Sequence, residues 1–332
     1  MQNFSAQQFL FNHIREIIPA NASLADTIAS VLNVSSDSAY RRIRCETALT
    51  IDETRALCEH FNISIDQLLH SNNNAVLFYN SRVDVKNHTF ENFLKDQENQ
   101  LLALRHFTEH EIIYLTKDIP LFHCFCFKPF FAFRYFFWMK SIIQHPDFRN
   151  KQFSFDCLPA HLEYIGQNIT KLYNSYPSTE LWNTECINSI IFQVEYYREV
   201  GYFQSNEDIG ILYNSVIEAL EHLCTQAEAG AKFLPHENAS FKKNNFQLYH
   251  NRIVLADNTI YARLNKKPVV YINYDVLNYM QTSNEKFCND SYEMLQNLIR
   301  RSTLISSQNE SQRYRFFQEV KQKLTNAAKI SY

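Results

Sequence analysis

The sequence NVSSDSAYRRIRCE, residues 33–46, decides how the first part of the chain is expected to fold. Asn33-Val34 has the composition of a tight turn, and Ser35 or Ser36 can cap a helix that follows it. That short helix carries three arginines: Arg41, Arg42 and Arg44. The stretch therefore indicates either a helix that reads DNA or an ordinary surface helix that carries arginine.

Apolar residues recur at helical spacing on both sides of this stretch. They favour helices over four further segments: residues 5–18, 24–32, 50–61 and 64–70. On the first of these, the expected inner stripe is Phe9, Leu10, His13, Ile14 and Ile17. Thr50 and Glu53 have the spacing of a full capping box, while Ala39 and Ile43 would face inward from the arginine-bearing helix. Five short helices with a tight turn between the second and third predict a helix-turn-helix unit.

Four short motifs occur together between Leu24 and Leu69. They are LADTIA, the NVS turn, RIRCE at the end of the third helix, and FNISIDQLL. Together they resemble the Cro/C1-type (XRE) helix-turn-helix family of DNA-binding regulators, over about a fifth of the chain. The resemblance implies that the third helix enters the major groove, with residues near its N-terminus touching base edges.

The same resemblance assigns roles to residues of the third helix. Those expected to face the bases are Ser36, Asp37, Tyr40 and Arg41. Those expected at the phosphates or the groove wall are Ser35, with the amide groups of the helix start, Arg42 and Arg44. Arginine suits guanine because its guanidinium matches the O6 and N7 acceptors.

Two features depart from the family pattern. Cys45 stands where the family often has glycine, which adopts the left-handed end of a helix at little cost, so a different exit or some strain is expected. Residues 1–70 contain five arginines, no lysine and eight acidic residues, a net charge of -3 that does not favour phosphate binding. Since the arginines gather on the helix that needs them, we expect modest affinity per monomer and a homodimer on double-stranded DNA. The alternative is a degenerate helix-turn-helix that binds protein and no DNA.

The stretch DIPLFHCFCFKPFFAFRYFFWMKSII, residues 118–143, contains eight phenylalanines, a tyrosine and a tryptophan. Lys128, Arg134 and Lys140 interrupt it and Pro129 breaks it, which argues against a membrane span. Two helices that meet at Pro129 are expected instead. Three interpretations remain open: protein core, an aromatic-walled pocket for an apolar small-molecule effector, or a subunit interface.

Composition argues against a cofactor or a metal. Four glycines among 332 residues leave almost no material for glycine-rich phosphate loops. His123, Cys124 and Cys126 lack a second cysteine or histidine pair at metal-site spacing, so core positions are expected. No catalytic arrangement can be picked out, and we expect no enzyme activity. Eight cysteines without regular spacing and the lack of a signal sequence indicate reduced thiols and a cytoplasmic protein.

The rest of the chain predicts a polar linker at 71–88, a helical domain at 89–235 and an α+β domain at 236–332. Helices are expected over 89–107, 158–176, 178–200, 206–229, 275–282, 284–305 and 309–328, with a strand or helix lead-in at 111–116. Near residue 240 alternating, β-branched segments predict three antiparallel strands. The fold class is therefore mainly α, with a small antiparallel sheet near the C-terminus. Residues 300–332, with seven basic and two acidic residues, are expected to form a solvated helix face.

These observations favour a DNA-binding transcription regulator. Residues 1–70 would read the DNA, and the larger module would dimerise, sense a ligand, or do both.

Overall fold

The computed structural model describes residues 5–18, 23–61, 63, 75–86, 88–237, 244–253, 257–265 and 267–330. The chain forms two compact units, Met1–Leu77 and Phe78–Tyr332. Each unit has its own hydrophobic core, and each is taken in turn.

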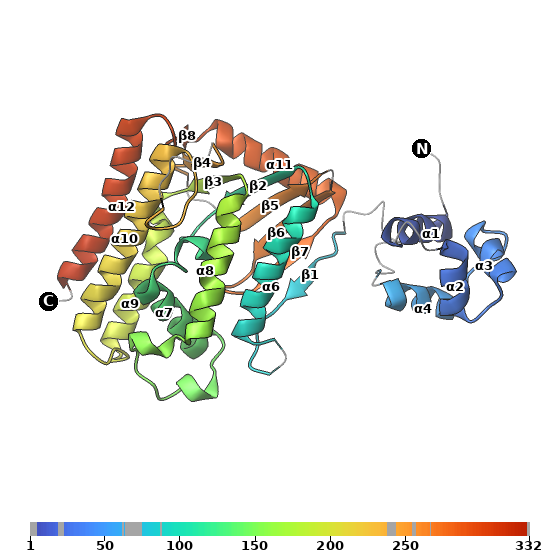
Figure 1. The fold of residues 1–332 in the computed structure, drawn as a ribbon, viewed down its shortest axis with the longest axis horizontal. Coiled ribbons are helices and arrows are strands. Elements are labelled where there is room, and N and C mark those ends of the chain that lie inside the picture. The colour runs from blue at the N-terminus through green and yellow to red at the C-terminus, as the bar shows by residue number, and fades with distance from the viewer. Residues whose placement is uncertain are drawn as a thin grey trace. The chain divides into compact units, whose positions relative to one another are not determined.

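The described residues of the N-terminal unit form four short helices (Figure 1). They are α1 (Ala6–Ile17), α2 (Leu24–Leu32), α3 (Ser36–Ile43) and α4 (Ile51–Phe61). A capping box of Ser5 and Gln8 starts α1, and the expected box of Thr50 and Glu53 starts α4, with both of its hydrogen bonds present. The fifth helix, expected over 64–70, lies outside the described residues.

The core of this unit takes residues from every helix. Its buried members are Leu10, Phe11, Ile14, Ile28, Ala29, Ala39, Leu57, Cys58 and Ile63. The stripe on α1 is rotated from the expected one: Phe11 is buried, whereas Phe9 is 43% and Ile17 47% exposed. Ala39 is buried as expected, and Ile43 packs on the core partly buried. The small side chain of Ala39 lets α3 lie close to the other helices while its opposite face remains in solvent.

One sheet organises the second unit, and eight of its strands lie in described residues. They are β1 (Tyr79–Ser81), β2 (His110–Leu115), β3 (Ser178–Trp182), β4 (Phe246–His250), β5 (Thr259–Leu264), β6 (Lys267–Asn273), β7 (Tyr279–Thr282) and β8 (Thr303–Leu304). Their order is β1-β7-β6-β5-β2-β3-β4-β8. The pairs β2–β3 and β3–β4 are parallel and the others antiparallel, so the sheet is mixed.

Helices cover both faces of this sheet. They are α6 (Phe90–Ala103), α7 (Lys128–Phe137), α8 (Ala160–Ser175), α9 (Asn188–Glu199), α10 (Glu207–Ala229), α11 (Glu285–Arg300) and α12 (Glu310–Ile330). Five short 3-10 turns complete the described helices: Leu104–His106, Leu121–His123, Pro146–Phe148, Phe155–Cys157 and Thr184–Ile187. Figure 1 shows α6 and α8 lying across one face of the sheet, and α10 and α12 side by side. Helix α11 packs Cys288 and Leu295 on the opposite face.

Strand β2 shows why the sheet has helices on both faces. Ile113 and Leu115 belong to the core beneath α11, whereas Ile112 belongs to the larger core on the other face. A strand buried on both faces reads as a continuous apolar run. Of the two possibilities left open for 111–116, the strand is the one present, beginning one residue earlier.

One expected helix, and the start of a second, form strands in the structure. The helix expected over 178–200 begins only at α9, because Ser178–Trp182 forms β3 between β2 and β4. The helix expected over 275–282 is replaced by β7, which pairs with β6 and β1. In both segments tertiary pairing overrides local helical propensity.

The α+β class is confirmed, but the sheet is larger than the small antiparallel one expected. Strands from 89–235 and from 236–332 alternate within it, so the boundary expected near 235 does not separate two compact units. The pattern of three neighbouring strands is also wrong, because β2 and β3 lie between β4 and β5. Strands that pair although they are far apart in the sequence, such as β2 and β5, leave no local pattern from which their pairing could be predicted.

The aromatic run forms part of the core. Pro129 lies in the first turn of α7, where a missing N–H does no harm, instead of separating two helices. Beyond α7 the chain continues as one π-helical turn, Trp138–Ile142. The fully buried phenylalanines of the run are Phe125, Phe130, Phe131, Phe133 and Phe136. Among the helices of the described residues, none is long and apolar enough to cross a bilayer.

Candidate functional site

Helix α3 is fixed at its start by two hydrogen-bonded serines. Asn33 has φ of 53° and ends α2 in the left-handed conformation, which asparagine tolerates. Ser35 caps α3 by accepting from the backbone N–H of Ser38, and Ser36 donates to Asp26 of α2 at 3.1 Å. The expected turn is therefore present, and Ser35, not Ser36, is the cap.

Most of the residues expected at DNA share one exposed face of α3. The face comprises Ser36, Asp37, Tyr40, Arg41 and Arg44, whose spacing brings them together on a helix. Tyr40 is 49% exposed, and the side chains of Arg41 and Arg44 are 63% and 68% exposed. Ser35 is exposed at the start of the helix. The structure thus brings six of the seven expected residues to the surface together.

Arg42 lies elsewhere. Its side chain is only 15% exposed, and Nη2 lies 2.7 Å from Oε1 of Glu53 on α4. Nη1 donates to the hydroxyl of Ser38 at 2.6 Å. A guanidinium held this way stabilises the packing of α3 on α4 and is not presented toward a duplex.

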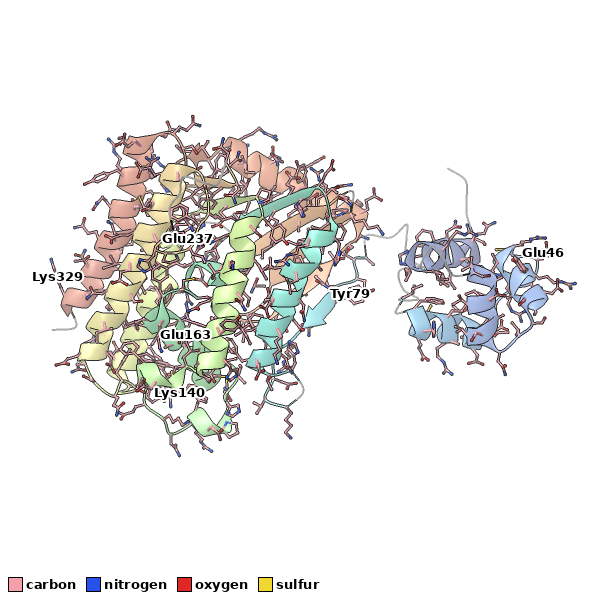
Figure 2. The ribbon with its side chains drawn as sticks, viewed as in Figure 1. Glu46, Tyr79, Lys140, Glu163, Glu237 and Lys329 are labelled. Atoms are coloured by element: carbon pink, nitrogen blue, oxygen red, sulfur yellow. The ribbon has the colours of Figure 1, made fainter. Side chains whose placement is uncertain are left out.

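The two outward arginines each have an acidic neighbour. Arg41 Nε lies 3.4 Å from Asp37, and Arg44 lies 3.8 Å from Glu46, on the loop after α3 (Figure 2). Both pairs are exposed and contribute little to stability. A phosphate or a guanine can therefore replace the carboxylate at small cost.

The exit from α3 is held by α1. The side-chain amide of Gln7 donates to the carbonyls of Arg42 and Thr47, and its oxygen accepts from Leu49 N–H. Within this exit Cys45 has φ of 61°, the left-handed conformation expected where the family often has glycine. The expectation of strain at Cys45 is thus supported by the backbone itself.

The Glu53 carboxylate contacts both Arg42 of α3 and the backbone at the start of α4. The Arg42 hydrogen bond is the largest influence on it and lowers its pKa, although partial burial acts in the opposite direction. It also accepts from the backbone of Thr50. Sequence reasoning assigned Glu53 to the cap alone, since a partner eleven residues away gives no pattern.

The second unit contains a cavity of about 400 Å³ between the sheet and helices α6, α7 and α8. Apolar and aromatic side chains make most of its wall, and Leu121, Phe122, Arg134 and Trp138 come from the aromatic run. Its volume is in the usual range for small-molecule sites. The run therefore supplies both core and pocket wall, two of the three interpretations left open.

His123 is a buried core residue, as expected. Its Nε2 lies 3.0 Å from Oε2 of Glu180, which is fully buried on β3. Tyr173 and Trp182 also donate to the Glu180 carboxylate, at 2.6 and 2.8 Å. Burial alone would raise the pKa of Glu180, but the charge and hydrogen bonds of its partners lower it to about 2.

All eight cysteines lie in described positions and are free thiols. In the part of the chain that the structure describes, no three histidine, cysteine or acidic side chains cluster as metal ligands would.

The geometry defines a helix-turn-helix unit with a solvent-exposed third helix. Residues 9–91, about a quarter of the chain, match the family model of the BetR domain, a helix-turn-helix-like DNA-binding domain. This match supports a regulatory DNA-binding N-terminus without singling out the Cro/C1 type. Neither the curated proteins nor the solved structures compared with the chain gave a match.

Proposed function

We propose that this protein is a transcription regulator that reads DNA with α3. The observation that carries the proposal is the exposed face on which Arg41 and Arg44 lie beside Tyr40, on the helix whose N-terminus Ser35 caps. In Cro/C1-type docking, such a face enters the major groove. Ser36, Asp37, Tyr40 and Arg41 then face base edges, while Ser35 and Arg44 contact phosphate. Arg42 positions the helix.

The second unit is the sensing and dimerising module in this proposal. Its cavity supplies a place for an apolar small-molecule effector. An exposed stripe on α9, Phe192 and Tyr196 followed by Val200, supplies an apolar face for a second copy. A ligand that binds one arrangement of a dimer better than another shifts the distance between its two helix-turn-helix units.

The experiment is a salt titration of DNA binding. Genomic fragments selected by the purified full chain are titrated by fluorescence anisotropy between about 50 and 200 mM salt. Contact with phosphates predicts a linear fall of log affinity with log salt, because each neutralised phosphate releases counterions. The double variant Arg41→Ala, Arg44→Ala should flatten the slope, whereas Arg55→Ala, an exposed arginine on α4, is the matched control.

The second candidate is a protein-interaction module without DNA binding. The observation in its favour is the acidic neighbour of each outward arginine, Asp37 and Glu46. It predicts that no genomic fragment is selected and that binding to DNA stays weak at low salt. The same titration therefore separates the two candidates.

A further inference from the structure

Two of the polar side chains in the wall of the cavity in the second unit come from α7 and its extension. Arg134 and Trp138 are one helical turn apart on α7 and its π-helical extension, and both line the cavity. Arg134 is 2% exposed and Trp138 is fully buried. A π-turn is often found at a functional site, and here it begins at Trp138.

Both side chains have buried N–H groups that no described residue satisfies. Nε and Nη2 of Arg134 and Nε1 of Trp138 are buried and have no hydrogen-bond partner among the described residues. Buried donors are almost always paired in folded proteins, and a buried charge is costly unless it is paired. Three unpaired donors in one cavity wall therefore call for an acceptor from outside the chain.

The neighbours of Arg134 do not replace that acceptor. Nη1 makes one long contact of 3.5 Å with Gln193, and the guanidinium carbon lies 5.5 Å from the Phe130 ring. Asp118 lines the same cavity, but no described carboxylate lies within ion-pair distance of Arg134. The charge is covered on one face by an aromatic ring, and its Nε and Nη2 stay buried without a partner among the described residues.

We infer that this cavity binds a small monocarboxylate with an apolar body. The carboxylate accepts from Nε and Nη2 of Arg134, the two-pronged pairing for which a guanidinium is shaped, and from Nε1 of Trp138. The apolar body lies against residues of the sheet and α6, such as Ile112, Ile260 and Phe93. This inference rests on the proposed sensing role for the biological meaning of binding, but the binding itself is measured without DNA.

The lining of the cavity favours a monocarboxylate over other anions. A phosphate monoester brings a second negative charge into a cavity whose described lining has one arginine, Arg134, and which Asp118 makes less favourable for it. A neutral apolar molecule would leave the donors unpaired, as they are without a ligand. At one side of the cavity the amide of Gln100 donates to the hydroxyl of Tyr279 at 2.9 Å, which joins α6 to β7 at the wall.

The test compares acids with neutral amides of the same shape. Octanoate and 4-phenylbutyrate are titrated into the full chain by calorimetry, beside octanamide and 4-phenylbutyramide. The expected result is binding of at least one acid about tenfold or more tighter than its amide, because only the acid presents an anion to Arg134. In Arg134→Gln this preference should fall to within a few-fold, while Arg134→Lys should keep part of it.

A second readout does not depend on a variant at Arg134. The chain has two tryptophans, so a ¹⁵N-indole spectrum has two signals, and Trp138→Phe assigns them. The acids should shift the Trp138 indole signal at the concentrations that calorimetry reports, whereas the Trp182 indole, already bonded to Glu180, should move less. An unmoved Trp138 signal, or equal affinity for acid and amide in the unmodified protein, overturns the inference.

The outcomes also separate this inference from the proposed function. Acids that bind at Trp138 but leave DNA affinity unchanged support the site and remove its regulatory role. Intact DNA binding without any acid binding removes the site and leaves the DNA reader in place.

Discussion

The guanidinium of Arg42 lies 2.7 Å from the carboxylate of Glu53, and the same carboxylate caps α4 through Thr50. One acidic residue thus starts α4 and holds α3 against it. As a consequence, only two of the three arginines in this stretch, Arg41 and Arg44, have exposed side chains. Arg41 and Arg42 are adjacent in the sequence, but the first is exposed on the surface and the second holds α3 against α4.

The first prediction separates these two roles. Arg41→Ala should weaken binding to the selected DNA by ~1–3 kcal/mol without changing stability, if it pairs with guanine. Arg42→Ala should instead lower the stability of the N-terminal unit by ~1–3 kcal/mol, because it leaves Glu53 without its charged partner. Anisotropy and amide hydrogen exchange across residues 23–61 measure the two effects. Equal DNA affinity for Arg41→Ala and the parent chain would remove Arg41 from the site.

The second prediction concerns the backbone at Cys45. Cys45→Gly should stabilise the N-terminal unit by ~1 kcal/mol, because glycine adopts φ of 61° without the Cβ clash. Cys45→Ala is the matched control, since alanine keeps the Cβ and should bring no such gain. Hydrogen exchange in α3 and α4 is the measurement. A gain from alanine as large as that from glycine would place the effect in the thiol and not in the backbone.

The third prediction concerns Glu180. Its folded pKa, about 2, lies below the ordinary value of 4.5, so the ionised form contributes stability above pH 4.5 that is lost as the pH falls toward 2. Glu180→Gln should destabilise the second unit by ~3–5 kcal/mol at pH 7, because His123 loses its buried partner. Urea unfolding followed at several pH values should show the two proteins converging below pH 4.5. A difference that stays constant down to pH 3 would argue against the ionised carboxylate.

The fourth prediction concerns the exposed stripe of α9. Phe192 is 69% exposed, and Phe192→Glu should shift the full chain from dimer toward monomer in light scattering, because a charge replaces apolar surface between copies. Tyr164→Glu is the control, an aromatic on α8 that is 65% exposed and outside the stripe. If Phe192→Glu leaves the mass unchanged, the proposed dimer uses another surface.

Local signals predicted the N-terminal unit closely. Caps, the turn at Asn33 and the inward Ala39 are all short-range features, and each is present. The position of Arg42 was not predictable, because its partner Glu53 lies on the next helix and had already been assigned to a cap.

The second unit was harder for a physical reason. Ser178 and Thr179 followed by Glu180 resemble the start of a helix. In the structure, however, the Glu180 carboxylate is buried and hydrogen-bonded to His123 and Tyr173, which lie on other elements. The cavity likewise depends on which residues of the aromatic run lie at its wall. In the sequence, Arg134 indicates only a charge that argues against a membrane span.

The order of strands has a consequence for synthesis of the chain. Strand β2 pairs with β3 and with β5, and the residues of β5 emerge from the ribosome about 150 residues after β2, roughly 7–30 s later at ordinary elongation rates. The helices of the N-terminal unit, in contrast, find their partners within a few dozen residues, which favours rapid folding. A nascent chain therefore completes its N-terminal unit well before the second unit, and chaperones have most to protect in the exposed edges of the unfinished sheet.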